Sequence, residues 1–389
     1  MDFGDKYVEI PVEVVSNTAP ATSRTPAIFA IMSSPPQPPP NPLHWKFDVD
    51  EYLSQNKVCC DKAVSLDTGT SCLILRLDGL KDTEASANGH HEGQPAIMKC
   101  AFSTPKYQKF AVSPERLQFE VKALKSEAVA EACRQEPSVQ VPRVLRETKN
   151  GFIMNHVGEM DLRTAFKTDA SLDMVKIGVR LGRWLGSLHL AGIALGPDGW
   201  SSRHDELDKF YAPGGLAEKA IKASMSEEES EKVLAAMRAP TPTHTLTPWD
   251  FRPMNIVVRL PTAGEAPPNL TVVDWELCHY GDPSNDIRMW VAETMILEAK
   301  FGNRGLLSSF LSSYKQQAGT TLVNEEFVSK VALSAGIYML WLIPINPRVW
   351  DCSEEDIEMW KAISLEYIRA GTNGNIAWLK MSCLAPLLE

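Results

Sequence analysis

Three polar side chains in the second half of the sequence have types and spacing that suit one kind of chemistry. Four residues separate Asp250 from Asn255, an apolar strand-like run follows, and Asp274 ends a second apolar run. A carboxylate at 250 can orient a hydroxyl group and accept its proton. The amide oxygen of Asn255 and the carboxylate of Asp274 are hard oxygen ligands of the kind that Mg²⁺ prefers. The segment therefore predicts proton abstraction beside a metal ion.

These residues also have a structural interpretation, in which Asp250 and Asn255 shape a turn and Asp274 ends a strand. The joint spacing favours the catalytic interpretation, because the run continues with Glu276, Gly281-Asp282-Pro283 and Asp286. An aspartate, an asparagine and a second aspartate divided by two strands are typical of the catalytic hairpin of kinases.

A second pair of residues points to phosphate binding. Lys99 lies in the strand-like segment Ala-Ile-Met-Lys-Cys, where protein kinases carry a phosphate-binding lysine, and Glu120 follows in the next expected helix. Glu120 falls between Leu117 and Leu124 on the apolar face of that helix. Burial without a cation would be costly, so we expect a Lys99–Glu120 pair. The alternative is a solvated glutamate on a loosely packed helix.

The segment from Val272 to Glu276, with Gly281 to Asp286, resembles the signature of the aminoglycoside phosphotransferase and choline kinase superfamily. Its details are most similar to fungal secondary-metabolite kinases, among them the hydroxytryptamine kinase of psilocybin biosynthesis. The resemblance extends from about residue 48 to 375, and residues 250–286 are its specific part.

The resemblance implies a small-molecule kinase that uses ATP and Mg²⁺ to phosphorylate a hydroxyl group of a small metabolite. Asp250 would be the catalytic base, and Asn255 and Asp274 would be the metal ligands. Asp286 would anchor the catalytic loop.

The resemblance also implies where the nucleotide binds. Backbone N–H groups of Thr68, Gly69, Thr70 and Ser71 would cover the phosphates. This loop has a single glycine, so the local pattern alone is weak evidence. Adenine would contact backbone groups of the segment that contains Asn155 and Val157. His189 lies in a Leu-His pair that we interpret as a packed core histidine, not a catalytic one.

One position departs from the pattern that the resemblance implies. A histidine is usual two residues before the base, and this sequence has Pro248 there. The resemblance implies that this histidine braces the loop and transfers no proton. The sequence therefore still supplies a residue for every chemical step. The alternative function is a catalytically degraded pseudokinase that binds nucleotide or metabolite and regulates a partner. A protein kinase is disfavoured, because no Asp-Phe-Gly to Ala-Pro-Glu activation segment follows.

An acidic group occurs near the C-terminus, at Asp351, Glu354, Glu355, Asp356 and Glu358. Such a run is most often the solvated start of a helix, where the helix dipole favours acids. The resemblance adds a second interpretation, in which C-terminal helices line the acceptor site and the acids hold a cationic amine. We favour the first interpretation.

The elements that must position these residues predict an α+β fold of the protein-kinase-like, two-lobe kind. Residues 1–43 form a proline-rich tail, 44–157 a nucleotide-binding lobe, and 158–389 a helical lobe with the catalytic hairpin at 245–286. The first lobe should hold an antiparallel sheet with a long exposed loop around His90 and His91. Expected strands cover 63–66, 72–77, 96–101, 142–147, 151–156, 256–259 and 270–273. Expected helices cover 174–190, 215–238, 285–300, 303–318, 325–343 and 353–371.

Composition limits the remaining possibilities. The 389 residues include 39 basic and 49 acidic side chains, and the net charge of −10 disfavours nucleic acid and anionic membranes as partners. No run approaches the roughly 20 apolar residues of a membrane span, and no basic, apolar leader is visible at the start. The eight cysteines form no CxxC pair and favour reduced thiols in a cytoplasmic protein. The oligomeric state stays open.

Overall fold

The structure is a computed structural model that describes residues 49–66, 72–91, 93–100, 115–201, 210–260, 269–345 and 352–389. Residues 41–389 form one compact unit. The predicted tail at 1–43, the phosphate-loop candidates Thr68, Gly69, Thr70 and Ser71, and Asp351 lie outside the described residues. The lobe boundary expected at 157 stays a prediction.

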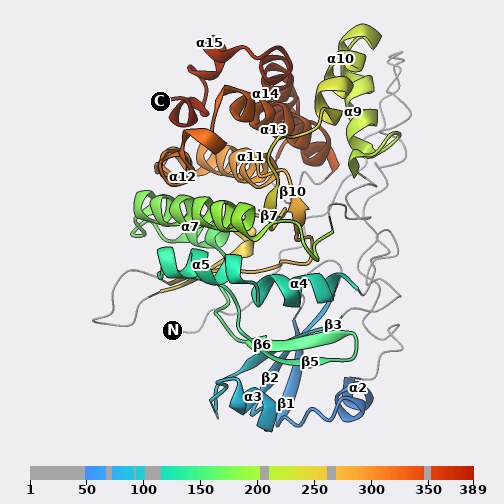
Figure 1. The fold of residues 1–389 in the computed structure, drawn as a ribbon, viewed down its shortest axis with the longest axis vertical. Coiled ribbons are helices and arrows are strands. Elements are labelled where there is room, and N and C mark those ends of the chain that lie inside the picture. Colours follow the sequence, from blue (N-terminus) through green and yellow to red (C-terminus); the bar gives the residue numbers. More distant parts are fainter. Residues whose placement is uncertain are drawn as a thin grey trace, which may run out of the picture. The chain divides into compact units, whose positions relative to one another are not determined.

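A five-stranded antiparallel sheet forms the N-terminal part of this unit, with strand order β1-β2-β3-β6-β5 (Figure 1). Its strands are β1 (Lys62–Leu66), β2 (Leu73–Asp78), β3 (Ala96–Cys100), β5 (Val144–Thr148) and β6 (Gly151–Asn155). The helices of the same stretch of chain are α2 (Val49–Gln55), α3 (Thr83–Ala87), α4 (Arg116–Leu124) and α5 (Glu127–Gln135). The antiparallel sheet and the helical remainder confirm the predicted α+β fold.

The central strand β3 explains where Lys99 points. Side chains alternate between the two faces of a strand, and Met98 packs in a core with residues of α2 and α3. Lys99 therefore faces the opposite side, which α4 covers. On that side Phe152, the register partner of Lys99 on β6, packs against Leu117 of α4.

Two expectations for this part of the chain were wrong. The predicted exposed loop between β2 and β3 contains α3, which Asp82 caps by accepting the N–H of Ala85. His90 in this loop is buried, whereas His91 is exposed. The helix α5, which begins after the N-cap residue Ser126, was not expected at all.

The C-terminal part is mainly helical, and its long helices pack in neighbouring pairs. Its helices are α6 (Leu162–Thr168), α7 (Met174–Leu195), α9 (Leu216–Ser224), α10 (Glu227–Arg238), α11 (Ser284–Phe301), α12 (Leu306–Leu322), α13 (Glu325–Ile345), α14 (Glu354–Asn373) and α15 (Ile376–Leu379). Figure 1 shows α7 between α5 and α12. A Cβ atom at Gly182 would lie 2.3 Å from the carbonyl oxygen of Phe310, so this glycine allows α7 to approach α12 closely. The single helix expected at 215–238 is two helices, because Ser226 caps α10.

Two small sheets build the predicted catalytic hairpin. Strand β9 lies between β4 and β8, and β10 pairs with β7. The strands are β4 (Val139–Gln140), β7 (Thr245–Thr247), β8 (Ile256–Arg259), β9 (Asn269–Val272) and β10 (His279–Gly281), with a short 3₁₀ turn at Pro253–Asn255. Ile256 pairs with Val272. This register brings the start of β8 and the end of β9 to one edge, where the polar residues of the hairpin follow.

One helix of the described residues, α13, is long and apolar enough to cross a membrane by length and composition. The expectation that no segment reaches this length was therefore wrong for Glu325–Ile345. However, 67% of its apolar window is buried inside the protein, where it packs against α11 and α14. Burial of this kind is what a core helix requires.

Candidate active site

The proposed base, Asp250, lies in the loop between β7 and β8, and its neighbours hold it on both sides. The side-chain amide of Asn255 donates to Asp250 Oδ2 at 2.7 Å and to the Asp250 carbonyl oxygen at 2.9 Å. Arg252 Nε lies 3.1 Å from Asp250 Oδ1. The Asp250 side chain is 12% exposed, so it is largely desolvated yet still reachable.

The surroundings of Asp250 change its affinity for a proton. Burial raises the pKa of Asp250, and the nearby negative charge of Asp274 raises it further, whereas Arg252 opposes the shift. The pKa of Asp250 is therefore higher than usual for an aspartate. A base with a raised pKa accepts a hydroxyl proton more readily near neutral pH.

Asp286, on the first turn of α11, holds the backbone of the loop at Trp249. Its Oδ1 accepts the backbone N–H of Trp249 at 2.7 Å, and its Oδ2 lies 3.0 Å from His189 Nε2. The other nitrogen of His189 lies 2.7 Å from the hydroxyl group of Tyr314. All three side chains are fully buried, so His189 is the packed core histidine that the sequence indicated.

The candidate metal ligands meet where β8 begins and β9 ends. The N–H of Val273 donates to the carbonyl oxygen of Asn255 at 2.9 Å and ties the two segments together. Asp274 follows with a φ of 66°, a conformation that non-glycine residues adopt mainly where surrounding structure enforces it. The Asn255 amide nitrogen is engaged by Asp250, which leaves its oxygen for a cation. Hard oxygens from these two residues fit Mg²⁺.

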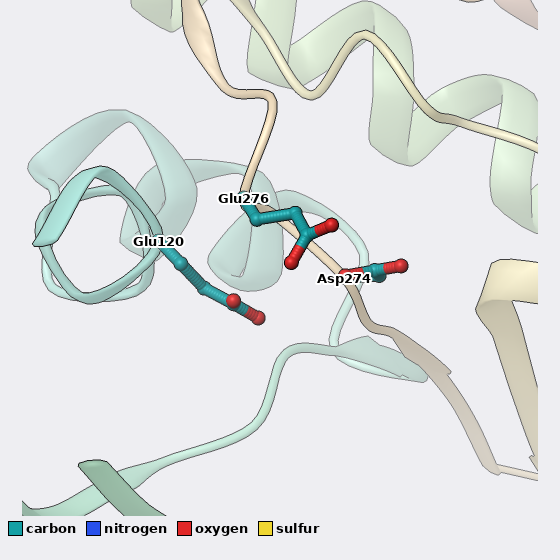
Figure 2. A group of neighbouring side chains, drawn as sticks. All are labelled: Glu120, Asp274 and Glu276. Atoms are coloured by element: carbon teal, nitrogen blue, oxygen red, sulfur yellow. The ribbon is translucent and has the colours of Figure 1, made fainter. Parts of the chain in front are cut away.

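Lys99 is the centre of a buried ionic cluster. Its Nζ lies 2.8 Å from Glu120 Oε2, 2.6 Å from Asp274 Oδ1 and 3.1 Å from Glu276 Oε2. Figure 2 shows that Glu120 reaches the cluster from α4, whereas Asp274 and Glu276 come from the segment after β9. The predicted Lys99–Glu120 pair is thus confirmed as a contact.

This cluster contains more negatively charged than positively charged side chains. Glu276 also pairs with Arg116 at 3.1 Å, so three carboxylates share two cations. Glu120 is the most deeply buried, and burial raises its pKa to about 7, although Lys99 acts against the shift. For Asp274, burial acts in the same direction, but the Lys99 ammonium outweighs it and lowers the pKa of Asp274. Asp274 is therefore ionised and ready to bind a cation.

The ligand oxygens of Glu120, Asp274 and Glu276 lie within 4.8 Å of one another, a spacing that could hold a metal ion. In this structure the Lys99 ammonium contacts all three and occupies the position of the cation. The triplet is therefore a lysine site, and the candidate metal pair is Asn255 with Asp274.

Sequence reasoning missed several residues of the site. Arg116 lies one helical turn before Glu120 on the same buried face, so its burial could have been expected. Glu276 was noted only as part of the signature. Glu293 lies in the middle of α11, accepts the hydroxyl of Tyr338 at 3.0 Å, and lies 3.4 Å from Arg252 Nη1. No local signal in the sequence links Glu293 to the base.

The nucleotide candidates at the end of β6 show no contact with the cluster in the described residues. Asn155 Oδ1 accepts the N–H of Arg143 at 2.6 Å, so its side chain is occupied by the sheet. Val157 is half-buried in the following loop. Their roles toward adenine stay predictions, as do the roles of Thr68, Gly69, Thr70 and Ser71 toward the phosphates.

The described part of the acidic group is the first turn of α14. Asp356 accepts the N–H of Ser353 at 2.9 Å, and its own N–H donates to Ser353 Oγ, which forms a capping box. Lys300 Nζ lies 3.2 Å from Asp356 Oδ2, and Glu354 and Glu355 are exposed. These contacts support the helix-start interpretation.

Comparison with known proteins gives one family. The sequence model of the phosphotransferase enzyme family (APH) matches residues 61–318. No curated protein matches the sequence. The solved structures with a similar fold include a choline kinase from Cryptosporidium parvum Iowa II, with 14% identity, a TM-score of 0.47, and coverage of 93% of this chain and 99% of that chain. An aminoglycoside 2'-phosphotransferase in complex with GDP has 15% identity and a TM-score of 0.49 over 86% and 99% of the two chains. A microcompartment-associated aminopropanol kinase has 15% identity and a TM-score of 0.47 over 87% and 98%.

Proposed function

The chain belongs to the phosphotransferase enzyme family, and on that premise we propose that it is a small-molecule kinase dependent on ATP and Mg²⁺. It transfers the γ-phosphoryl group to a hydroxyl group of a small metabolite. Asp250 orients that hydroxyl and accepts its proton as the bond to phosphorus forms.

The observation that carries this proposal is that one site contains both a cation suited to phosphate oxygens, Lys99, and a carboxylate suited to act as a base, Asp250. Lys99 offers a buried cation for phosphate oxygens, and Asp274 connects it to the loop of the base. Asp274 lies close enough to Asp250 for its negative charge to raise the pKa of Asp250. A phosphoryl donor between Lys99 and Asp250 would thus have a cation on one side and a base on the other.

A bound Mg²⁺ ion would supply charge neutralisation in this arrangement. Asn255 and Asp274 would hold Mg²⁺, which would neutralise negative charge on the phosphate oxygens. Glu120 would hold Lys99 in position. One of its carboxylate oxygens contacts Lys99, and the other accepts the backbone N–H of Trp275 at 3.3 Å, which fixes the carboxylate itself. The protein would act in the cytoplasm, on an amino alcohol, a hydroxyindole or an aminoglycoside-like compound. Similarity to fungal secondary-metabolite kinases stays a prediction.

A screen of hydroxyl-bearing metabolites tests the function. The purified chain is incubated with ATP and Mg²⁺, and products are examined by mass spectrometry for an added phosphate. We expect at least one acceptor to be phosphorylated, with loss of product when Mg²⁺ is chelated. If nucleotide binds in calorimetry but no acceptor across these classes is phosphorylated, the pseudokinase alternative replaces this proposal.

A further inference from the structure

The residue before the base has an unusual backbone conformation. Trp249 has a φ of 65°, in the left-handed region, where the Cβ of an ordinary residue crowds the neighbouring carbonyl group. A large side chain stays there only where the surrounding structure enforces it. The bond from its N–H to Asp286 is one such restraint. The contacts of its ring are a second.

The ring of Trp249 packs against a buried guanidinium. Arg288 Cζ lies 4.5 Å from the centroid of the Trp249 ring and 4.6 Å from that of Tyr211. The two rings have centroids 5.8 Å apart and meet at 77°. Tyr338 contributes a third ring, 6.0 Å from the same Cζ. We call Arg288, Trp249, Tyr211 and Tyr338 the aromatic clamp.

The guanidinium of the clamp is a buried cation, and its burial requires a compensating interaction. Arg288 is 2% exposed, and its Nε and Nη2 atoms have no hydrogen-bond partner among the described residues. A buried cation is costly, and an aliphatic side chain would fill the same space without that cost. Ring faces attract a cation most strongly where water is excluded. The ring faces, together with the negative charge of the nearby Asp286, therefore compensate the burial of Arg288.

Helix α11 thus restrains Trp249 twice. Asp286 holds the backbone N–H, and Arg288, two residues later on the same helix, holds the ring. The peptide that joins Trp249 to Asp250 is fixed between these restraints. Its orientation sets the direction in which the Asp250 side chain leaves the backbone.

We propose that the aromatic clamp is a positioning device for the base, which keeps Trp249 in the left-handed conformation and thereby directs the Asp250 carboxylate toward Asn255 and the acceptor. This inference rests on the proposed function. Without the clamp, Trp249 relaxes to a negative φ, and Asp250 moves away from Asn255. A displacement of about 1 Å in a reacting group costs about 100-fold in rate.

The Arg288→Met variant tests the clamp by structure and by kinetics. Its crystal structure should show Trp249 with a negative φ and the contact between Asp250 and Asn255 broken. With a confirmed acceptor, kcat should fall by about 10- to 100-fold while the affinity for Mg²⁺ and ATP stays within about twofold. The thermal midpoint should change little, because the variant removes the desolvation cost of the buried cation together with its contacts with the rings. Arg288→Lys keeps the cation and should recover part of kcat.

Arg304→Met is the matched control. Arg304 Cζ lies 5.0 Å from the ring of Phe166, and its guanidinium donates to the carbonyl oxygens of Phe166 and Leu172, neither of which belongs to the loop of the base. This variant should lower the thermal midpoint and leave kcat unchanged. The two arginines thus separate a loss of positioning from a loss of stability.

The outcomes distinguish the clamp from the function itself. A crystal structure of Arg288→Met in which Trp249 keeps its positive φ and Asp250 still contacts Asn255 overturns the clamp, whether or not an acceptor is known. A kcat within about threefold of wild type overturns the clamp and leaves the proposed function intact. Failure of the wild type to phosphorylate any acceptor overturns the function and leaves the crystallographic test standing. If Arg288→Met does not fold, Tyr211→Leu opens the other side of the guanidinium and is measured in the same way.

Discussion

The loop around Asp250 and the ionic cluster around Lys99 belong to one site, but different forces hold them. In the loop, Asn255 and Asp286 bond to Asp250 and Trp249, two neighbouring residues of the loop. In the cluster, the contacts are ion pairs between side chains from β3, α4 and the segment after β9. The loop is held by hydrogen bonds from Asn255 within it and from Asp286 on α11, whereas the cluster is held by ion pairs between three separate segments.

This difference has a consequence for electrostatics. The loop itself contributes one carboxylate, Asp250, with Arg252 beside it, and α11 adds the buried carboxylates Asp286 and Glu293. In the cluster, three carboxylates contact two cations directly. An excess of buried negative charge favours binding of one more cation or proton. The cluster is thus the part of the site that should respond to Mg²⁺ and to pH, and the loop is the part that should respond to geometry.

Asp250→Asn gives the largest expected effect and acts on the loop alone. The amide keeps the shape of the side chain but cannot accept a proton, so kcat should fall by about 10²- to 10⁴-fold while nucleotide still binds. Turnover with a confirmed acceptor and calorimetry with a non-hydrolysable ATP analogue measure the two properties. Asp173→Asn, at the N-cap of α7, is the control, because asparagine also caps helices. Turnover of the Asp250 variant within about threefold of wild type would remove Asp250 from its role.

Asp274→Ala should instead damage nucleotide binding. This carboxylate would link the protein to the metal on the phosphates, and its loss should weaken binding of a Mg²⁺–nucleotide complex by about 100-fold or more. Calorimetry with and without Mg²⁺ measures the effect. Unchanged affinity together with unchanged dependence on Mg²⁺ in the folded variant would place the metal elsewhere and erase the contrast between loop and cluster.

The same contrast explains what the sequence could predict. The proximity of Asp250, Asn255 and Asp274 could be predicted, because their spacing reflects a single hairpin. The Lys99–Glu120 pair could be predicted because a carboxylate on an apolar helix face needs a cation, and Lys99 already had a predicted role in phosphate binding.

Residues whose role depends on distant packing were not found. Arg116 and Glu293 carry no local signal of what they contact, since their partners lie 160 and 41 residues away, at Glu276 and Arg252. The break between α9 and α10 was readable, because Ser226 followed three residues later by Glu229 is typical of a helix start. The strained φ of Trp249 was not readable, because it results from restraints by α11.

Glu120→Gln should change how stability depends on pH. Because the pKa of Glu120 is raised from 4.5 to about 7, the folded protein keeps a proton that the unfolded chain has already released. The stability of the wild type should therefore fall as pH rises from 4.5 to about 7, by on the order of 3 kcal/mol. The variant binds no proton at this position and should lack that fall.

Urea unfolding of both proteins across this pH range is the measurement, with the exposed Glu228→Gln as a control that should keep the wild-type slope. A wild-type curve parallel to that of Glu120→Gln would mean that Lys99 and Arg116 fully neutralise the cluster. The proposed excess of negative charge, and with it the contrast to the loop, would then be wrong.

The acidic start of α14 gives the smallest expected effect, because it belongs to neither the loop nor the cluster. Glu354 and Glu355 are exposed, and Asp356 is engaged by Ser353 and Lys300, so water and the helix start already stabilise these charges. Single Glu354→Gln and Glu355→Gln variants should therefore leave the preference for an amine acceptor over its deaminated analogue within about twofold of wild type. The ratio of kcat/KM for the two acceptors measures this preference. A drop of about tenfold in either variant would instead assign these carboxylates to recognition of a cationic amine, since a tenfold change requires an interaction stronger than exposed charges provide.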